Sequence, residues 1–244
     1  LVSVNNTTIA KADANAKTVY VHTFTYNVKN EKLQIASELV SITNKVASSP
    51  KVKAVVDSWN NILDENIKEV IANPSEVIYT AQTPLDGTDT ANRSTQTNLG
   101  KLITQGMFYA YKDDVDLVFV NGGSFRLDDM LDGDVTSLDI FRVLPFGGSV
   151  YKIKIKGKLL KEVLDYGEAQ AGTGAYLHRM YVERKTVNGP WLYKGSPIED
   201  NKTYTAAVSD FLMKGFDIPF LTPEHEGIVA VYKPLENETA GDIR

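Results

Sequence analysis

The chain has 244 residues, of which 43% are hydrophobic and 23% charged, and these values are typical of a globular protein that can form a sizeable core. Its formal net charge of −5 argues against binding a nucleic-acid polymer, because neutralising phosphates requires clustered Lys and Arg side chains. It has no cysteine, which excludes disulfides and thiolate sites, and no apolar stretch approaches the roughly 20 residues that a membrane span needs.

The first third of the sequence predicts a loop, a β-hairpin and a long helix. Residues 1–17 are polar without an apolar period, so we expect a loop or a frayed end. Two β-prone runs follow from Thr18 on either side of a polar turn at residues 29–32, which is typical of a hairpin. Ser48-Ser49-Pro50 is a helix-start signal, and the apolar residues after it recur at steps of three and four as far as Asn73-Pro74. This helix has a length that suits a connector between two bodies.

Beyond residue 75, strands and helices alternate. Residues 115–120 form an almost unbroken apolar run, as expected of a strand covered on both faces. Asn98 is expected to cap one helix, and a short helix is expected to start near Thr136 or Ser137. Residues 151–156 alternate between apolar and Lys side chains, as a half-exposed strand should. Because the elements interleave without a regular βαβ rhythm, the predicted fold class is α+β, with a mixed β-sheet and flanking helices.

The three histidines do not predict a metal centre. His22, His178 and His225 lack the spacing of a metal site such as His-x-x-x-His or Asp-x-His. We therefore expect no catalytic metal site in these 244 residues. Each histidine is expected to be an ordinary structural or surface residue.

Two glycine-containing loops are candidates for contact with a ligand. Residues 121–126 directly follow the predicted buried strand, and their two glycines allow close approach to the backbone. Arg126 supplies a planar cation that can bind phosphate or ribose oxygens at two points. By itself this loop could equally be a tight turn with a surface salt bridge. Residues 144–148 place Phe146 between a proline and two glycines, and by themselves they could be a loop with a core phenylalanine.

Five segments along the chain form an ordered series: Asn92-Arg93-Ser94, Asn98 to Ile103, Val120 to Arg126, Leu144 to Gly148, and Asp210-Phe211 to Asp217. The series resembles the motifs of the 5'-nucleotidase C-terminal domain over about residues 76–222. The hairpin and long helix before it resemble that family's last phosphoesterase-domain strands and its interdomain helix. The resemblance implies a remnant of a metallophosphoesterase domain at residues 1–45, an interdomain helix at 46–75 and a substrate-binding domain at 76–244.

The resemblance also implies roles for two rings and two cations. Phe146 and Phe211 match the positions of two rings that sandwich a nucleobase, an arrangement in which each stacked face contributes about 1 to 3 kcal/mol. Arg93 and Arg126 match arginines that hold the phosphate and ribose side of the substrate. The alternatives are that Phe211 belongs to the core and that Arg93 only forms a salt bridge.

Two further polar residues match the family's motifs, and one segment departs from them. Asn121 matches an asparagine that contacts the nucleoside, and Asp217 matches an aspartate suited to accept hydrogen bonds from ribose hydroxyls. The family usually has Gly-Gly-Asp-Gly around this aspartate, whereas residues 215–219 read Gly-Phe-Asp-Ile-Pro. Phe216 adds bulk and Ile218 stiffens the loop, which puts the base preference and the position of Asp217 in question.

The resemblance implies that the intact protein removes phosphate from nucleoside 5'-phosphates, while this part binds base and ribose. The family's ligands for two divalent metal ions would lie upstream of Leu1, so no cofactor is expected in this chain. Its expected partners are a nucleotide or nucleoside and its own N-terminal catalytic domain, and the chain alone is expected to be inactive. Since family members are often exported, a periplasmic or extracellular location is expected.

Two alternatives stay open at this point. The chain could be a stand-alone module that binds nucleosides or nucleotides without any catalytic domain. It could also belong to the same family but act on nucleotide sugars, cyclic nucleotides or a sulfur-containing ester.

Overall fold

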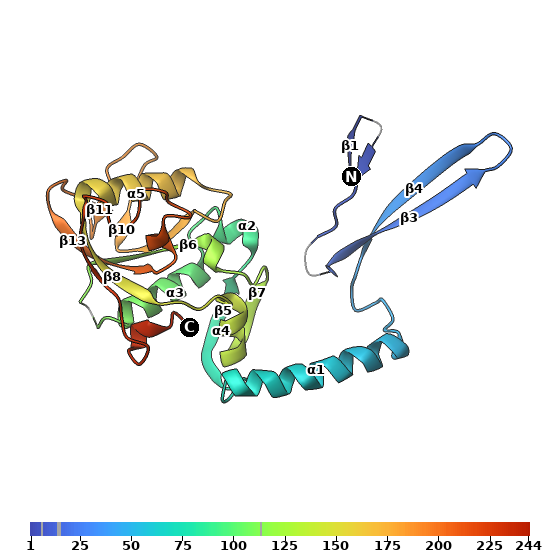
Figure 1. Ribbon diagram of the computed structural model, residues 1–244, viewed down its shortest axis with the longest axis horizontal. Helices are drawn as coiled ribbons and strands as arrows, with labels where there is room; N and C mark the ends of the chain where they lie inside the picture. Colours follow the sequence, from blue (N-terminus) through green and yellow to red (C-terminus); the bar gives the residue numbers. More distant parts are fainter. Residues whose placement is uncertain (6, 14–15, 113) are drawn as a thin grey trace. The chain divides into compact units, whose positions relative to one another are not determined.

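The structure is a computed structural model that describes residues 1–244 apart from residues 6, 14–15 and 113 (Figure 1). It divides into two units, Leu1–Ile67 and Lys68–Arg244. In chain order, with η for a 3-10 helix, the elements are β1 (Val2–Val4), β2 (Thr7–Ile9), β3 (Thr18–Asn27), β4 (Lys32–Ser41), α1 (Pro50–Val70), β5 (Val77–Asp86), α2 (Asp89–Asn92), α3 (Asn98–Tyr109), β6 (Leu117–Asn121), η2 (Gly122–Ser124), β7 (Met130–Thr136), α4 (Ser137–Val143), β8 (Val150–Lys156), α5 (Gly157–Ala169), β9 (Leu177–Met180), β10 (Val182–Glu183), β11 (Leu192–Tyr193), β12 (Ser196–Pro197), β13 (Thr203–Ser209), η3 (Leu212–Lys214), β14 (Ile228–Tyr232) and η4 (Thr239–Gly241).

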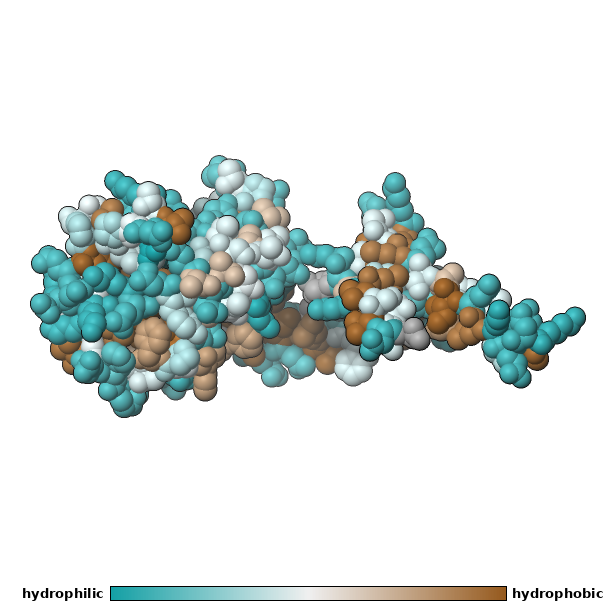
Figure 2. All heavy atoms as spheres, turned by 90° about the horizontal axis from the view of Figure 1, so that it is seen from above, coloured by the Kyte–Doolittle hydropathy of each residue, from teal (hydrophilic) through white to brown (hydrophobic). Residues whose placement is uncertain are grey.

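The first unit is built from antiparallel strand pairs. β3 and β4 pair from Thr18 opposite Ser41 to Asn27 opposite Lys32, which confirms the predicted hairpin. The prediction of a loop over residues 1–17 is wrong at β1 and β2, which also pair. Every residue of these two short strands is exposed, so no apolar alternation marks them in the sequence. The surface of this unit is partly apolar (Figure 2), and the exposed apolar side chains of β3 and β4 include Val19, Val21, Phe24, Tyr26, Leu33, Ile35 and Leu39.

The long helix α1 begins at Pro50, as the helix-start signal predicts, and ends at Val70, a few residues before the predicted end at Asn73-Pro74. Its apolar side chains recur at steps of three and four, so they share one face of the helix. In the described part of the chain that face is exposed, and it includes Val52, Val55, Val56, Trp59, Ile62 and Leu63. The helix therefore presents an apolar stripe to its surroundings.

The second unit contains a five-stranded sheet in the order β14-β8-β13-β6-β9. β13 and β6 run parallel, whereas the other neighbouring pairs are antiparallel. Two smaller sheets, β5-β7 and β10-β11-β12, are formed by the remaining strands of this unit. This mixed sheet with flanking helices confirms the predicted α+β class.

Each face of the five-stranded sheet packs against a helix, and β6 shows why. Leu117 and Phe119 belong to the core cluster that includes the apolar face of α5, whereas Val118 and Val120 belong to the cluster that includes α3. Figure 1 shows these two helices beside the sheet. All five residues of β6 are buried, so the predicted strand covered on both faces is confirmed. Burying one such side chain stabilises the folded state by about 1.5 to 3 kcal/mol. The sheet is thus a rigid support for the loops that leave its strand ends.

The two predicted helix starts have different outcomes. α4 begins at Ser137 behind a capping box, in which Thr136 and Asp139 each bond to the other's backbone N–H group, as the sequence predicts. The cap of α3 is Thr97 and not Asn98, because the Thr97 hydroxyl accepts from the Gly100 N–H at 3.0 Å. The Asn98 side chain bonds instead to the end of β5, where its oxygen accepts from the Asp86 N–H at 2.7 Å.

Candidate functional site

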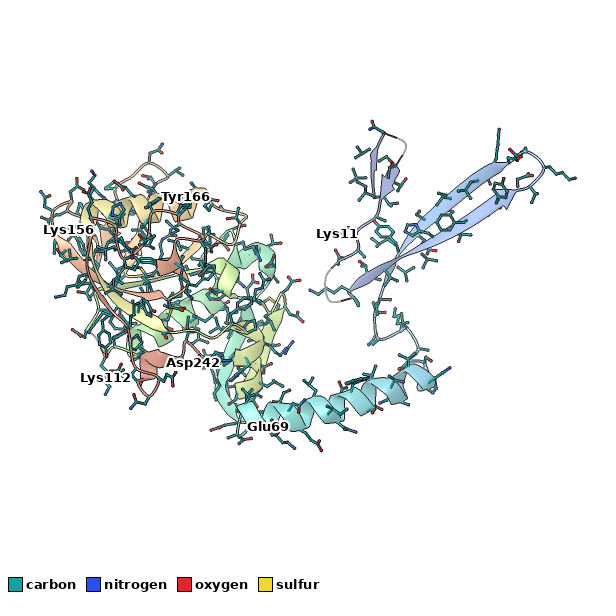
Figure 3. The ribbon with its side chains drawn as sticks, viewed as in Figure 1. Lys11, Glu69, Lys112, Lys156, Tyr166 and Asp242 are labelled. Carbon is teal, nitrogen blue, oxygen red and sulfur yellow. The ribbon has the colours of Figure 1, made fainter. Side chains whose placement is uncertain are left out.

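A cleft of about 470 Å³ opens in the second unit at one edge of the sheet. All six residues singled out from the sequence line it, namely Arg93, Asn121, Arg126, Phe146, Phe211 and Asp217. They come from segments as far apart as the loop after α2 and the loop after η3. The C-terminal end of the chain also reaches the cleft through Ile243, next to Asp242, which is labelled in Figure 3.

The strand directions explain why these residues meet. β8 and β13 are antiparallel neighbours, and Val150 at the start of β8 lies opposite Ser209 at the end of β13. The loop that carries Phe146 enters β8 and the segment that carries Phe211 leaves β13, so both lie at the same edge of the sheet. β6 runs parallel to β13, which brings Asn121 at its end to that edge as well.

The two rings are accessible and have different neighbours. The Phe146 side chain is 72% exposed, and its ring centroid lies 5.6 Å from the guanidinium carbon of Arg126. The Phe211 side chain is 36% exposed, and its ring lies 5.6 Å from that of Phe216 at an interplanar angle of 47°. Neither ring belongs to a core cluster, so the alternative that either is a core phenylalanine is wrong. Both can offer an aromatic surface to a flat ligand.

A chain of hydrogen bonds fixes the polar side chains after β6. The Asn121 amide nitrogen donates to the Asp217 carboxylate at 2.7 Å, and the Ser124 hydroxyl donates to the Asn121 amide oxygen at 2.7 Å. Because Asn121 is buried, this pairing satisfies a side chain that would otherwise lose its hydrogen bonds with water. The same bond holds Asp217 toward Asn121, although Phe216 and Ile218 replace the small residues that the family usually has beside that aspartate.

The two arginines differ in how they are held. The Arg93 guanidinium donates through Nε to the Asp89 carboxylate at 2.7 Å, so it forms the salt bridge considered from the sequence and also lines the cleft. Arg126 has an exposed side chain, and its backbone N–H donates to the Val143 carbonyl at 2.9 Å. The Arg93 backbone is held as well, since its N–H donates to the Asp89 carbonyl at 3.2 Å. Both arginines therefore extend from a hydrogen-bonded backbone next to the cleft.

The glycines of the loop after β6 allow this loop to pack closely against the backbone of neighbouring segments. A Cβ atom added at Gly122 would lie 2.1 Å from the Asn92 carbonyl oxygen. The Gly122 and Gly123 N–H groups donate to the carbonyls of Tyr176 and Gly174, at 2.7 and 2.9 Å. The expectation that both glycines admit a ligand is thus wrong for Gly122, which packs on the chain itself, while Gly123 does line the cleft.

Several cleft residues were not singled out from the sequence. Asp210 and Lys214 flank Phe211, and the Lys214 ammonium donates to the Asp210 carboxylate at 2.9 Å. Ser209 lies at the end of β13, and its buried hydroxyl has no hydrogen-bond partner among the residues that the structure describes. Asp210 already stood in the motif around Phe211, which is a signal that could have identified it. Nothing in the sequence pattern points to Ile243.

His178 is a buried structural residue that does not line the cleft. Its Nε2 atom lies 2.8 Å from the Asn92 carbonyl oxygen, and since a carbonyl only accepts, Nε2 carries the hydrogen. The pKa of His178 is lowered from 6.5 to about 4, chiefly by burial; the hydrogen bond to Asn92 opposes this shift and the Arg179 charge adds to it. The folded chain therefore keeps this imidazole neutral at ordinary pH.

This lowered pKa predicts a loss of stability in mild acid. As the pH falls below 6.5, the unfolded chain protonates His178 and the folded chain does not, so the free energy of unfolding should fall by about 1.5 kcal/mol by about pH 5. Well above pH 6.5, where the ring is neutral in both the folded and the unfolded chain, this residue should contribute no pH dependence. An NMR titration of the His178 ring checks it, because the imidazole should stay mostly neutral down to about pH 5. A His178 midpoint near 6.5 in the folded chain would contradict the assignment.

Neither a metal cluster nor a membrane-spanning helix is found in the part of the chain that the structure describes. No group of three or more His, Asp or Glu side chains there is arranged to hold a metal ion. None of the described helices combines the length and the apolar character that crossing a bilayer requires.

Comparison with known proteins identifies the domain that carries the cleft. The family model for the 5'-nucleotidase C-terminal domain matches residues 77–222, more than half of the chain. The chain is 30% identical over 142 residues to the trifunctional nucleotide phosphoesterase protein YfkN of Bacillus subtilis, covering 57% of this chain and 9% of that protein. It is 24% identical over 212 residues to mouse 5'-nucleotidase, covering 73% of this chain and 34% of that protein. It thus spans about a third or less of these relatives.

Solved structures agree on the fold. The 5'-nucleotidase precursor of Thermus thermophilus superposes with a TM-score of 0.71 at 24% identity, over 93% of this chain and 45% of that one. The NAD nucleotidase of Haemophilus influenzae gives a TM-score of 0.52 at 19% identity, over 90% of this chain and 43% of that one. With the family model matched over the segment that builds the sheet and the cleft, the chain belongs to the 5'-nucleotidase family and carries its C-terminal domain.

Proposed function

We propose that the cleft binds the base and ribose of a nucleotide, and that the intact protein removes phosphate from nucleoside 5'-phosphates. The observation that carries this proposal is that two accessible rings, Phe146 and Phe211, line one cleft together with two guanidinium groups. A nucleobase gains stacking energy on both of its faces, and a planar cation suits phosphate and ribose oxygens. The cleft therefore offers the two kinds of contact that a nucleotide needs.

Four polar residues of the cleft have a place in this proposal. Asp217 accepts hydrogen bonds from the ribose hydroxyls, and Asn121 orients it while contacting the nucleoside. Arg93 and Arg126 bind the phosphate and ribose side. The names of the relatives support a nucleotide ligand, since they include 5'-nucleotidases and an NAD 5'-nucleotidase.

The metal chemistry of the proposed reaction needs residues outside this chain. Since the described residues provide no cluster of metal ligands, they do not fit the two divalent ions that the family resemblance implies. We place those ions in an N-terminal catalytic domain of the intact protein. Residues 1–45 would be the end of that domain, 46–75 the connecting helix and 76–244 the substrate-binding domain. The exposed apolar stripe of α1 and the apolar surface of the first unit suit contact with such a partner. A periplasmic or extracellular location completes the proposal.

The test combines binding and turnover. The chain should bind adenosine and AMP in a calorimetric titration and should release no phosphate from AMP in the presence of Mn²⁺ or Zn²⁺, because recognition and chemistry reside in different domains. UDP-glucose is the comparison ligand for a nucleotide-sugar substrate. Turnover of AMP by this chain alone would contradict the division of labour, and tighter binding of UDP-glucose than of AMP would contradict the substrate class.

A further inference from the structure

The carboxylate of Asp210 lies between the two loops that carry the rings. Asp210 precedes Phe211, yet a Cβ atom added at Gly148 would lie only 2.6 Å from its Oδ1 atom. The Asp210 backbone N–H also donates to the Ser149 carbonyl at 2.9 Å, which fixes this position. Gly148 and Ser149 belong to the segment that follows Phe146. The carboxylate thus sits at the junction of the two ring-bearing segments and lines the cleft.

One of its two oxygens is left for a ligand. Oδ2 accepts from the Lys214 ammonium at 2.9 Å. In the part of the chain that the structure describes, no hydrogen bond is made to Oδ1. An ionised carboxylate has acceptors and no donor, so this free oxygen selects for an N–H or O–H group.

Asp210 is separate from the polar side chains that suit the ribose. Those side chains, Asn121, Ser124 and Asp217, are joined to one another by hydrogen bonds, whereas Asp210 is joined to Lys214. The two groups line the same cleft. A base held between the rings, with its ribose at the first group, can present its other edge to the second.

We propose that Asp210 is a specificity-determining residue that favours bases with an amino group at C6 of a purine or C4 of a pyrimidine. This inference rests on the proposed nucleotide-binding function of the cleft. Adenine carries an amino donor at N6 and cytosine one at N4, whereas an oxo base presents an acceptor at the equivalent edge. An acceptor facing the Asp210 carboxylate loses its hydrogen bond to water without gaining a partner. The substrate class is therefore nucleotides of 6-aminopurines and 4-aminopyrimidines.

Lys214 provides the competing expectation. Its ammonium lines the cleft too and could donate to an oxo group, which would favour hypoxanthine and uracil. Because the Lys214 ammonium already donates to Asp210, we expect the free carboxylate oxygen of Asp210 to decide the base preference. The sign of the preference therefore distinguishes the two side chains.

The experiment compares nucleosides that differ at this edge, by calorimetric titration of the chain. Adenosine should bind at least about 10-fold more tightly than inosine. Cytidine should likewise bind more tightly than uridine. Asp210→Asn should bring both ratios close to one, because an amide offers a donor and an acceptor. The matched control is Asp114→Asn, which alters a carboxylate paired with Lys152 outside the cleft and should leave both ratios unchanged.

The outcomes separate this inference from the function on which it rests. Equal affinities for amino and oxo nucleosides, a preference for the oxo partners, or ratios that survive Asp210→Asn would each overturn it while leaving nucleoside binding intact. Failure of all four nucleosides to bind would overturn the proposed function itself. The wild-type ratios need no variant, so the inference stays testable if Asp210→Asn does not fold.

Discussion

Replacing Phe146 or Phe211 with alanine should weaken adenosine binding by roughly 5-fold to 150-fold, because each ring is expected to supply about 1 to 3 kcal/mol of stacking. The Phe146 side chain is mostly exposed and Phe211 lies outside both core clusters, so the free energy of unfolding should change little. Calorimetric titration and thermal unfolding of each variant measure the two effects separately.

The matched control for the ring variants is Phe24→Ala. Phe24 lies on β3 in the first unit, and its side chain is 63% exposed, comparable with Phe146. This variant should bind adenosine like the unaltered chain. Unchanged affinity in both Phe146→Ala and Phe211→Ala would show that the rings do not hold the base.

Gly122→Ala should destabilise the domain by about 3 kcal/mol, the upper end of what overpacking usually costs, and should abolish nucleoside binding. The added methyl group would lie 2.1 Å from the Asn92 carbonyl oxygen, and this neighbour is buried backbone that cannot rotate away. Moving that carbonyl also breaks its hydrogen bond with His178 and displaces Arg93, the next residue. Urea unfolding and calorimetric titration measure both losses.

Gly106→Ala is the control for this substitution. Gly106 lies within α3, and a Cβ atom there would meet nothing within 4 Å. Alanine stabilises a helix interior more than glycine does, so the free energy of unfolding of this variant should rise by about 0.5 to 1 kcal/mol. If Gly122→Ala were as stable as Gly106→Ala and still bound adenosine, the packing of η2 against α2 would not be what holds the cleft together.

Periodicity made much of the fold predictable. The steps of three and four after Pro50 identified α1, and the apolar run over residues 115–120 identified β6, because burial requires those patterns. β7 was not foreseen, since its middle reads Asp132-Gly133-Asp134 and lacks apolar alternation. The Thr97 cap was misplaced by one residue, because both Thr97 and Asn98 have side chains that can cap a helix and only the tertiary contact with β5 decides between them.

The membership of the cleft was predictable only through the family's motifs. No spacing rule brings Phe146 and Phe211 together; their meeting depends on β8 and β13 being antiparallel neighbours with Val150 opposite Ser209. Asp210 stood in the motif around Phe211 but received no role, since its contact with the segment around Gly148 exists only after those strands pair. Strand order is a long-range property that local sequence patterns do not encode.

A crystal structure of the chain soaked with adenosine tests most directly whether this cleft recognises a nucleoside. We expect the adenine ring between the side chains of Phe146 and Phe211, with the ribose hydroxyls donating to the Asp217 carboxylate. Adenosine bound elsewhere on the chain, or resting on one ring with Asp217 still bonded only to Asn121, would contradict the assignment.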